Sequence, residues 1–146
     1  MPKAHHTLSS LRAEDVMTPN PVTVGSTSTV QDAADMMVAV DVRHLSVVTQ
    51  GTLVGMIGDR DLRSYMLPHP EKVLHADEAR ICMDASVSAV MRTDMITVRP
   101  DTPVAPLIDI LLKEKIGAVP VLASDTGELI GMVSYIDVLR AMRPFI

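Results

Sequence analysis

Aromatic residues and cysteine are almost absent from this sequence. Its 146 residues include no tryptophan, one phenylalanine and two tyrosines, so the chain lacks the stacking surfaces that single-stranded nucleic acids require. The net charge of −5 also argues against a nucleic-acid binder, which usually carries a basic face. The single cysteine, Cys82, excludes an internal disulfide and fits a reducing compartment.

Long apolar runs and enzyme signatures are missing as well. No segment is apolar over the length of a membrane span, and the N-terminus lacks the apolar core of a signal peptide, so we expect a cytoplasmic protein. The sequence contains no Gly-x-Ser-x-Gly elbow, Walker loop or glycine-rich dinucleotide fingerprint. Its histidines show no zinc-binding spacing. We therefore expect neither catalysis nor a metal site, and no required cofactor.

What the chain does have is an apolar content of 47%, enough for a core, and an internal repeat. Val16-Met17 recurs as Val90-Met91 and Thr23-Val24 as Thr97-Val98, at a constant offset (91 − 17 = 74). Two apolar stripes, each typical of a helix with one buried face, keep this offset. The stripes are Val30, Ala33, Ala34, Met37 and Val38, and then Val104, Leu107, Ile108, Leu111 and Leu112.

After each stripe, two short apolar runs are separated by turn residues, as in a β-hairpin. The first turn is Gln50-Gly51, and the second, at residues 124–127, is longer and shifts the offset (131 − 55 = 76). A helix then closes each repeat, at Asp59–Met66 and at Tyr135–Met142. The predicted unit is strand–helix–strand–strand–helix, and because neither copy alone buries both faces of a small sheet, the two should pack together.

The predicted fold is therefore α+β, with a first repeat at 8–66, a linker at 67–84 and a second repeat at 85–146. The two copies resemble a tandem pair of CBS domains, named after cystathionine β-synthase. The segments that carry the resemblance are Val16–Val24, Leu53–Leu62, Val90-Met91, Ile96–Val98, Gly117–Val121 and Gly131–Asp137. The resemblance implies two βαββα repeats packed as a pseudo-two-fold pair around small mixed sheets, in a stand-alone module that forms homodimers.

The resemblance also implies a ligand, an adenosine-containing molecule such as AMP, ADP, ATP or S-adenosylmethionine. In the second repeat, Asp137 would accept hydrogen bonds from the ribose hydroxyls, and Ser134 would donate to a ribose or phosphate oxygen. An adenine slot would be formed, largely by backbone, from Thr97, Val98, Gly117, Ala118, Val119 and Pro120. The small Gly117-Ala118 pair would let a flat ring approach the backbone closely.

The first repeat departs from this pattern. Gly58 stands where a hydroxyl residue is expected, while Asp61 is kept. The resemblance therefore implies a second, weaker site here, in which basic side chains could hold phosphates. The other residues of this weaker site would be Thr23, Arg43, His44 and Arg60.

The sequence leaves two functions open. Ser134 and Asp137 also fit a capping box, which stabilises a helix by about 1 kcal/mol without any ligand. The leading hypothesis is a regulatory sensor that binds an adenosine-containing ligand between its repeats and signals to a partner protein. The alternative is a non-catalytic dimerisation or protein-interaction module with degenerate ligand sites.

Overall fold

The computed structural model describes residues 8–66 and 82–146. These residues form two compact units that do not follow the order of the repeats. The Asp137 unit contains residues 8–21 and 96–146, and the Asp61 unit contains residues 22–66 and 82–95. Of the predicted linker, 67–84, all but the last three residues lie outside the described residues. None of the helices in the described ranges is both long and apolar enough to cross a membrane.

The Asp61 unit has a three-stranded sheet in the order β2-β3-β4, in which β2 is parallel to β3 and β3 is antiparallel to β4. Its elements are β2 (Thr23–Gly25), β3 (His44–Thr49), β4 (Thr52–Gly58), α2 (Val30–Ala39), α3 (Asp59–Met66) and the 3-10 helix η2 (Val87–Ala89). Gln50 and Gly51 have φ angles of 49° and 79°. Positive φ at both central residues is typical of the type I′ turn, whose twist matches that of a hairpin.

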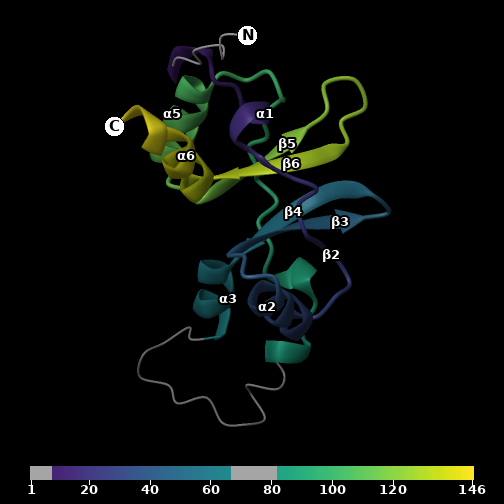
Figure 1. Cartoon of the computed structure of the whole chain (residues 1–146). Coiled ribbons are helices and arrows are strands. Elements are labelled where there is room, and N and C mark those ends of the chain that lie inside the picture. The colour runs from purple at the N-terminus through teal and green to yellow at the C-terminus, as the bar shows by residue number, and fades with distance from the viewer. Residues whose placement is uncertain (1–7, 67–81) are drawn as a thin grey trace. The chain divides into compact units, whose positions relative to one another are not determined.

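The Asp137 unit has an antiparallel sheet in the order β1-β6-β5. Its strands are β1 (Thr18–Pro19), β5 (Ala118–Leu122) and β6 (Leu129–Ser134). Its helices are η1 (Leu8–Ser10), α1 (Ala13–Val16), α5 (Val104–Glu114), α6 (Tyr135–Met142) and η3 (Arg143–Phe145). Helices α5 and α6 lie together beside the β5–β6 hairpin (Figure 1).

The predicted α+β fold with small sheets is confirmed, and both closing helices begin and end at the predicted residues. The first strand of the second repeat is shorter than expected. Only a single parallel bridge joins Val98 to Val121. Pro100 follows two residues later, and since proline has no N–H to donate, the ladder does not continue there.

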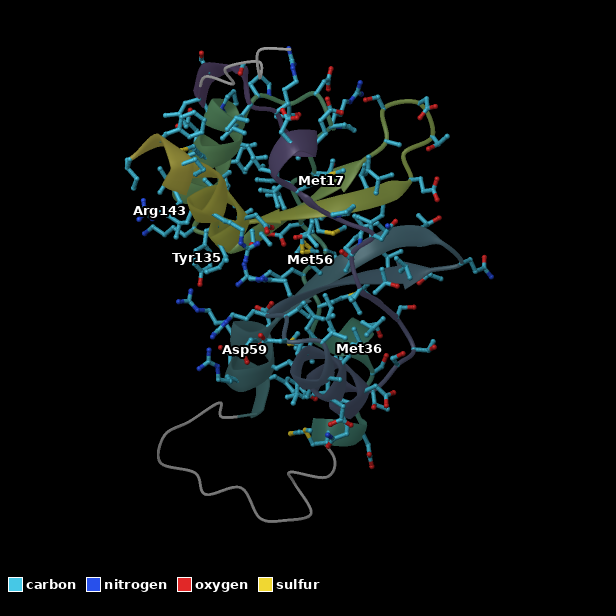
Figure 2. All side chains as sticks on the ribbon, viewed as in Figure 1. Met17, Met36, Met56, Asp59, Tyr135 and Arg143 are labelled. Atoms are coloured by element: carbon cyan, nitrogen blue, oxygen red, sulfur yellow. The ribbon has the colours of Figure 1, made fainter. Side chains whose placement is uncertain are left out.

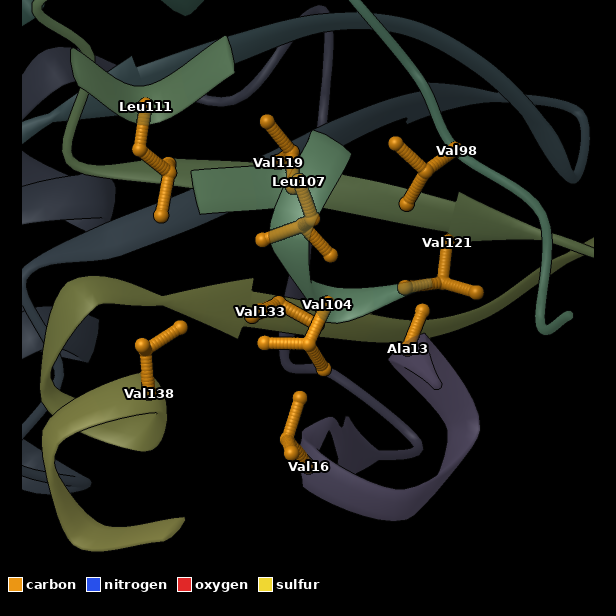
Figure 3. Packing of buried hydrophobic residues seen from close by; sticks show 10 residues of the cluster. All are labelled: Ala13, Val16, Val98, Val104, Leu107, Leu111, Val119, Val121, Val133 and Val138. Carbon is orange, nitrogen blue, oxygen red and sulfur yellow. The ribbon is translucent and has the colours of Figure 1, made fainter. Parts of the chain in front are cut away.

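Each unit has its own apolar core. In the Asp137 unit, valines of the β5–β6 hairpin pack against α5 and α6, as Figure 3 shows. The residues of this core are Ala13, Val16, Val98, Val104, Leu107, Leu111, Val119, Val121, Val133 and Val138. The prediction that both helical stripes are buried is wrong at their last positions, where Val38 is 82% and Leu112 70% exposed. The eighth position after the start lies at the margin of a helical apolar face.

The opening segment of each repeat, which contains Thr18 or Arg92 and is called the lead-in below, pairs with the last strand of the other repeat. Thr18 of β1 pairs with Met132 of β6 in the Asp137 unit. In the Asp61 unit, Arg92 forms an antiparallel bridge with Met56 of β4. The two pairs are equivalent, because Thr18 and Arg92 are 74 positions apart (92 − 18 = 74) and occupy the same place in the repeat. Each compact unit is therefore completed by residues that belong, along the chain, to the other repeat.

This pairing requires glycine in the last strand. A Cβ added at Gly131 would contact Met17 Sδ and lie 3.2 Å from the Thr18 carbonyl oxygen; Met17 is labelled in Figure 2. A Cβ added at Gly55 would lie 2.6 Å from Met91 Sδ and 2.9 Å from the Arg92 carbonyl oxygen. Glycine at these positions allows the crossing segment to approach the strand.

We expect Gly55→Ala to destabilise the protein by about 1–3 kcal/mol, because the new methyl group forces the backbone at Arg92 to move. The measurement is urea denaturation followed by circular dichroism. Gly25→Ala is the matched control in the same unit, since its Cβ would meet only Ser28 Oγ, at an ordinary 3.5 Å. Equal unfolding free energies for the two variants would contradict the proposed role of Gly55.

Candidate functional site

The junction of β6 and α6 joins Ser134 to Asp137. The backbone N–H of Asp137 donates to Ser134 Oγ at 3.2 Å, and the backbone N–H of Ser134 donates to Asp137 Oδ2 at 2.9 Å. These two bonds form the capping box that the sequence predicts. Ser134 Oγ also lies 3.0 Å from Asp137 Oδ2. The strand end thus fixes the serine, and the serine fixes the carboxylate at the start of the helix.

Asp137 is buried, with 8% of its surface exposed. Its second oxygen, Oδ1, accepts a hydrogen bond from Thr18 Oγ1 at 3.1 Å. Arg140 Nη1 is 3.5 Å from the same oxygen, but the arginine side chain is 74% exposed, so solvent weakens this ion pair. The group that holds Oδ1 is therefore mainly a neutral hydroxyl, which another hydroxyl group can replace without breaking a strong ion pair.

The predicted adenine slot lies beside β6, the strand that leads into the helix of this carboxylate. Ala118 of β5 pairs directly with Ser134, and the N–H of Tyr135 donates to the Gly117 carbonyl oxygen at 3.1 Å. Val98 flanks β5 on its other side, opposite Val121. From strand spacing and rise, the distance from Ser134 to Thr97 is about 12 Å. A row of backbone groups therefore extends from the carboxylate toward Thr97, whose side chain is exposed.

Most side chains of the predicted slot do not face a ligand. Val98 and Val119 belong to the core of the Asp137 unit. Ala118 and Pro120 alternate with Val119, so they face the opposite side of the strand, and both are buried. Only backbone groups of this stretch remain for recognition, and some of them are already bonded. The Gly117 carbonyl oxygen accepts from Tyr135, and Pro120, which has no N–H, accepts from Val98 at 3.0 Å.

The equivalent junction in the Asp61 unit differs in its partners. Asp61 Oδ2 accepts from the backbone N–H of Gly58 at 2.9 Å, which is half of the capping box. Gly58 has no side-chain hydroxyl to accept a hydrogen bond from the backbone N–H of Asp61. Asp61 Oδ1 instead forms an ion pair with Arg92 Nε at 3.0 Å, and the side chains of Asp61 and Arg92 are 17% and 53% exposed. A charged group therefore stands here where Thr18 stands in the Asp137 unit.

Thr18 and Arg92 are two site residues that the sequence analysis missed. Each lies just after the Val-Met pair that opens a repeat, and each contacts the aspartate of the other repeat's closing helix. The 74-residue offset marks them as equivalent positions. It does not reveal their contacts, because only the folded chain shows that each opening segment pairs with the last strand of the other repeat.

The remaining residues predicted for the weaker site are only partly brought together. His44 pairs across the hairpin with Gly58, and the carbonyl oxygen of Arg43 accepts from the Asp59 N–H at 2.8 Å. Thr23 pairs with Ser46, two residues from His44 along β3, and it also lines a hollow of about 450 Å³ between β2 and α2 that no other predicted site residue lines. The other residues of this hollow are Val24, Gly25, Ser28, Asp32, Asp35, Met36 and Ala39.

Burial lowers the pKa of His44 below its ordinary value of 6.5, because the charged imidazolium loses solvation; Arg43 lowers it further, while Asp61 and Asp59 raise it. The unfolded chain therefore binds a proton on His44 at a higher pH than the folded protein does. As the pH falls through 6.5, this difference stabilises the unfolded state, until the folded histidine is protonated too.

We expect the free energy of unfolding of the wild type to fall relative to that of His44→Gln as the pH is lowered from about 8 to about 5. Urea denaturation at intervals across this range measures both curves. Parallel curves for the two proteins would show that the His44 pKa is the same in the folded and unfolded states.

The described parts of the chain contain no group of three or more histidine, cysteine, aspartate or glutamate side chains arranged to hold a metal ion. Each of the two junctions carries a carboxylate, that of Asp137 or of Asp61. A carboxylate can accept hydrogen bonds from a pair of hydroxyl groups.

Comparisons of the sequence and of the fold with known proteins point to the same family. The sequence model of the CBS domain matches residues 13–68 and 87–144, one match over most of each repeat. A solved structure of CBSX2 in complex with AMP is 28% identical, has a TM-score of 0.75, and is matched over 92% of this chain and 97% of that one.

Two curated relatives show the repeat pair in different settings. The CBS domain-containing protein YhcV of Bacillus subtilis is 28% identical over 85% of this chain and 80% of its own length. Homoserine O-acetyltransferase of Methanocorpusculum labreanum is 27% identical over 87% of this chain, which spans only 23% of that enzyme. The shared region is thus nearly the whole of one relative and a small part of the other.

Proposed function

Because the chain belongs to the CBS domain family, we propose that it is a regulatory module that binds an adenosine-containing ligand at Asp137. The observation that carries the proposal is the buried carboxylate of Asp137, held by the Ser134 cap on one oxygen and by the Thr18 hydroxyl on the other. A ribose diol offers two hydroxyl donors to such a carboxylate and can replace Thr18.

Two further features support the proposal. An adenine ring can lie along the backbone row beside Ser134, because Gly117 carries no side chain that would block it. The similar chain CBSX2 has been solved with AMP. The candidate ligands are AMP, ADP, ATP and S-adenosylmethionine, which share the adenosine group that the site would read.

We infer that signalling to a partner protein starts at Thr18. This residue begins β1, the short strand that attaches the lead-in segment to β6. A ligand that takes Oδ1 of Asp137 removes the side-chain contact of Thr18 and weakens that attachment. The ligand would bind more tightly when the lead-in is released from β6 than when it is attached. Ligand binding would therefore shift the lead-in toward the released state.

The same site is poorly suited to catalysis. Ser134 Oγ bonds to Asp137 and has no histidine partner within the described parts of the chain. A serine nucleophile needs a base within hydrogen-bond reach. We therefore propose a binding role for Ser134 and Asp137 without a chemical step.

Isothermal titration calorimetry with AMP, ADP, ATP, S-adenosylmethionine and adenosine tests the proposal. At least one should bind, with a rise in melting temperature that grows with ligand concentration. If none releases heat or raises the melting temperature, the adenosine proposal fails and the alternative, an interaction module with degenerate sites, is favoured.

A specific observation favours association of two copies of the chain, alongside ligand binding. The exposed side of α6 carries Tyr135, Ile136 and Leu139, which are 45%, 44% and 62% exposed. Three adjacent apolar side chains on one helix suit an isologous contact, in which the same surface meets itself. We propose a homodimer that buries this face.

We expect Leu139→Glu to convert the dimer into a monomer, because a charge would be buried without a partner at the contact. Multi-angle light scattering on a gel-filtration column measures the mass. Circular dichroism of Leu139→Glu shows whether the variant folds. A wild-type monomer, or a dimeric variant, would contradict this interface.

A further inference from the structure

The methionine of each Val-Met pair lies against a glycine of the strand with which its lead-in pairs. A Cβ placed at Gly131 of β6 would contact Met17 Sδ and lie 3.0 Å from Met17 Cγ. A Cβ placed at Gly55 of β4 would lie 2.6 Å from Met91 Sδ and 3.0 Å from Met91 Cγ. Both thioethers therefore occupy the space that a side chain would fill at the glycine, and each packs its lead-in onto the strand.

Both of these methionines are also within reach of solvent. Met17 and Met91 are half-buried, whereas Met37 and Met132 are buried. Met17 packs at the margin of the core of the Asp137 unit, and Met91 packs at the margin of the core of the Asp61 unit. A small oxidant therefore reaches these two side chains in the folded protein.

On the side that faces the glycine, neither sulfur has room for an added oxygen. The backbone atom that lies closest to the added Cβ is in both cases a carbonyl oxygen, that of Thr18 at 3.2 Å or that of Arg92 at 2.9 Å. A sulfoxide oxygen is also an acceptor, so it would remain unpaired there, and an unpaired buried acceptor is unfavourable. A sulfoxide that turns toward water instead takes the side chain off the glycine. In either case the lead-in loses its packing.

The residue after each methionine holds an aspartate. Thr18 donates to Asp137, and Arg92 forms an ion pair with Asp61. The backbone pairing that supports these contacts is short, because β1 has two residues and the second lead-in forms a single bridge, between Arg92 and Met56. We therefore expect the attachment of each lead-in to its strand to depend on the packing of the methionine.

We propose that Met17 and Met91 are oxidation sites through which peroxides release the two lead-ins. Hydrogen peroxide transfers one oxygen atom to the thioether sulfur, which loses two electrons and becomes a sulfoxide; the O–O bond breaks and water leaves. Methionine sulfoxide reductases return the sulfoxide to methionine, so the change is reversible. This inference goes beyond the proposed function and requires no nucleotide.

The test is treatment of the full, ligand-free chain with hydrogen peroxide, with two measurements on the same samples. Peptide mass spectrometry gives the fraction of sulfoxide at each methionine, and amide hydrogen exchange followed by NMR reports the lead-ins. The amide of Asn20 reports the first, because it donates to the Ile130 carbonyl oxygen at 3.1 Å. The amide of Arg92 reports the second, because it donates to the Met56 carbonyl oxygen at 2.7 Å.

Leucine variants show which sulfur is responsible. Met17→Leu and Met91→Leu remove the oxidisable atom and keep an apolar side chain of similar volume. Met142→Leu and Met36→Leu are the matched controls, since both residues are half-buried against the same two cores; Met17 and Met36 are labelled in Figure 2. Exchange in the untreated variants shows whether each lead-in is attached before oxidation.

We expect exchange at Asn20 and Arg92 to become about tenfold faster or more when the sulfoxides form, the effect of one unpaired buried acceptor. Exchange at Tyr135, whose N–H donates to Gly117, should stay the same. Each lead-in leucine variant should keep its own lead-in protected under peroxide, and the two control variants should not. Methionine sulfoxide reductases should restore slow exchange in the wild type, a result that does not depend on how well leucine fits.

Three results would overturn the proposal. The first is oxidation of the two control methionines while Met17 and Met91 stay reduced, which would mean that the lead-in sulfurs are shielded. The second is unchanged exchange at Asn20 and Arg92 after both lead-in methionines are oxidised. The third is equally fast exchange in the peroxide-treated lead-in variants and the treated wild type. Because no nucleotide is present, each result leaves the adenosine proposal to its own calorimetric test.

Discussion

Asp137→Ala should raise the dissociation constant for adenosine at least tenfold and lower the free energy of unfolding by about 1–2 kcal/mol. The binding loss follows because the carboxylate is the proposed acceptor of both ribose hydroxyls. The stability loss follows because the backbone N–H and hydroxyl of Ser134 and the hydroxyl of Thr18 lose their acceptor. Calorimetry and urea denaturation measure the two effects.

Asp109→Ala is the matched control for this prediction, since Asp109 is an exposed aspartate on α5 of the same unit. It should leave both adenosine affinity and stability nearly unchanged. Adenosine affinity that is the same in Asp137→Ala and the wild type would show that the carboxylate serves only as a helix cap.

Leu107→Ala should destabilise the protein by about 2–5 kcal/mol, because it leaves a cavity in a close-packed core. Leu107 is fully buried and belongs to the same core cluster as the hairpin valines of the Asp137 unit (Figure 3). Urea denaturation again gives the free energy of unfolding.

Leu112→Ala makes the same chemical change on the same helix, but its side chain is 70% exposed. Its effect on the monomer should stay within about 0.5 kcal/mol. Similar losses for the two variants would mean that α5 packs by a different face.

The sequence predicts the local structure well because its signals are local. The apolar period, the Gln50-Gly51 turn and the capping box at Ser134 each depend on residues a few positions apart, and each is present in the structure. The same holds for the boundaries of the closing helices.

The partners of the two aspartates could not be predicted in this way. Thr18 is 119 positions from Asp137, and Arg92 is 31 positions from Asp61. Both contacts depend on a lead-in segment that pairs with the other repeat's last strand. A repeat pattern shows which residues are equivalent, but not which copy each residue joins.

Burial also decides which of the predicted site residues have side chains that can face a ligand, and residue type alone does not show this. Val98 and Val119 are near the right place, yet their side chains serve the core. Ser46, which the sequence analysis does not name, is buried with a hydroxyl that bonds to none of the described residues. The polarity of a residue indicates its chemistry, whereas its use depends on which face of the strand it occupies.

A crystal structure of the chain grown with AMP tests the central claim most directly. We predict AMP in the Asp137 unit, with both ribose hydroxyls bonded to the Asp137 carboxylate, the Thr18 hydroxyl displaced, and the adenine beside the backbone of Gly117. AMP found elsewhere, with Asp137 still bonded to both Ser134 and Thr18, would contradict the claim that this carboxylate is the ribose acceptor.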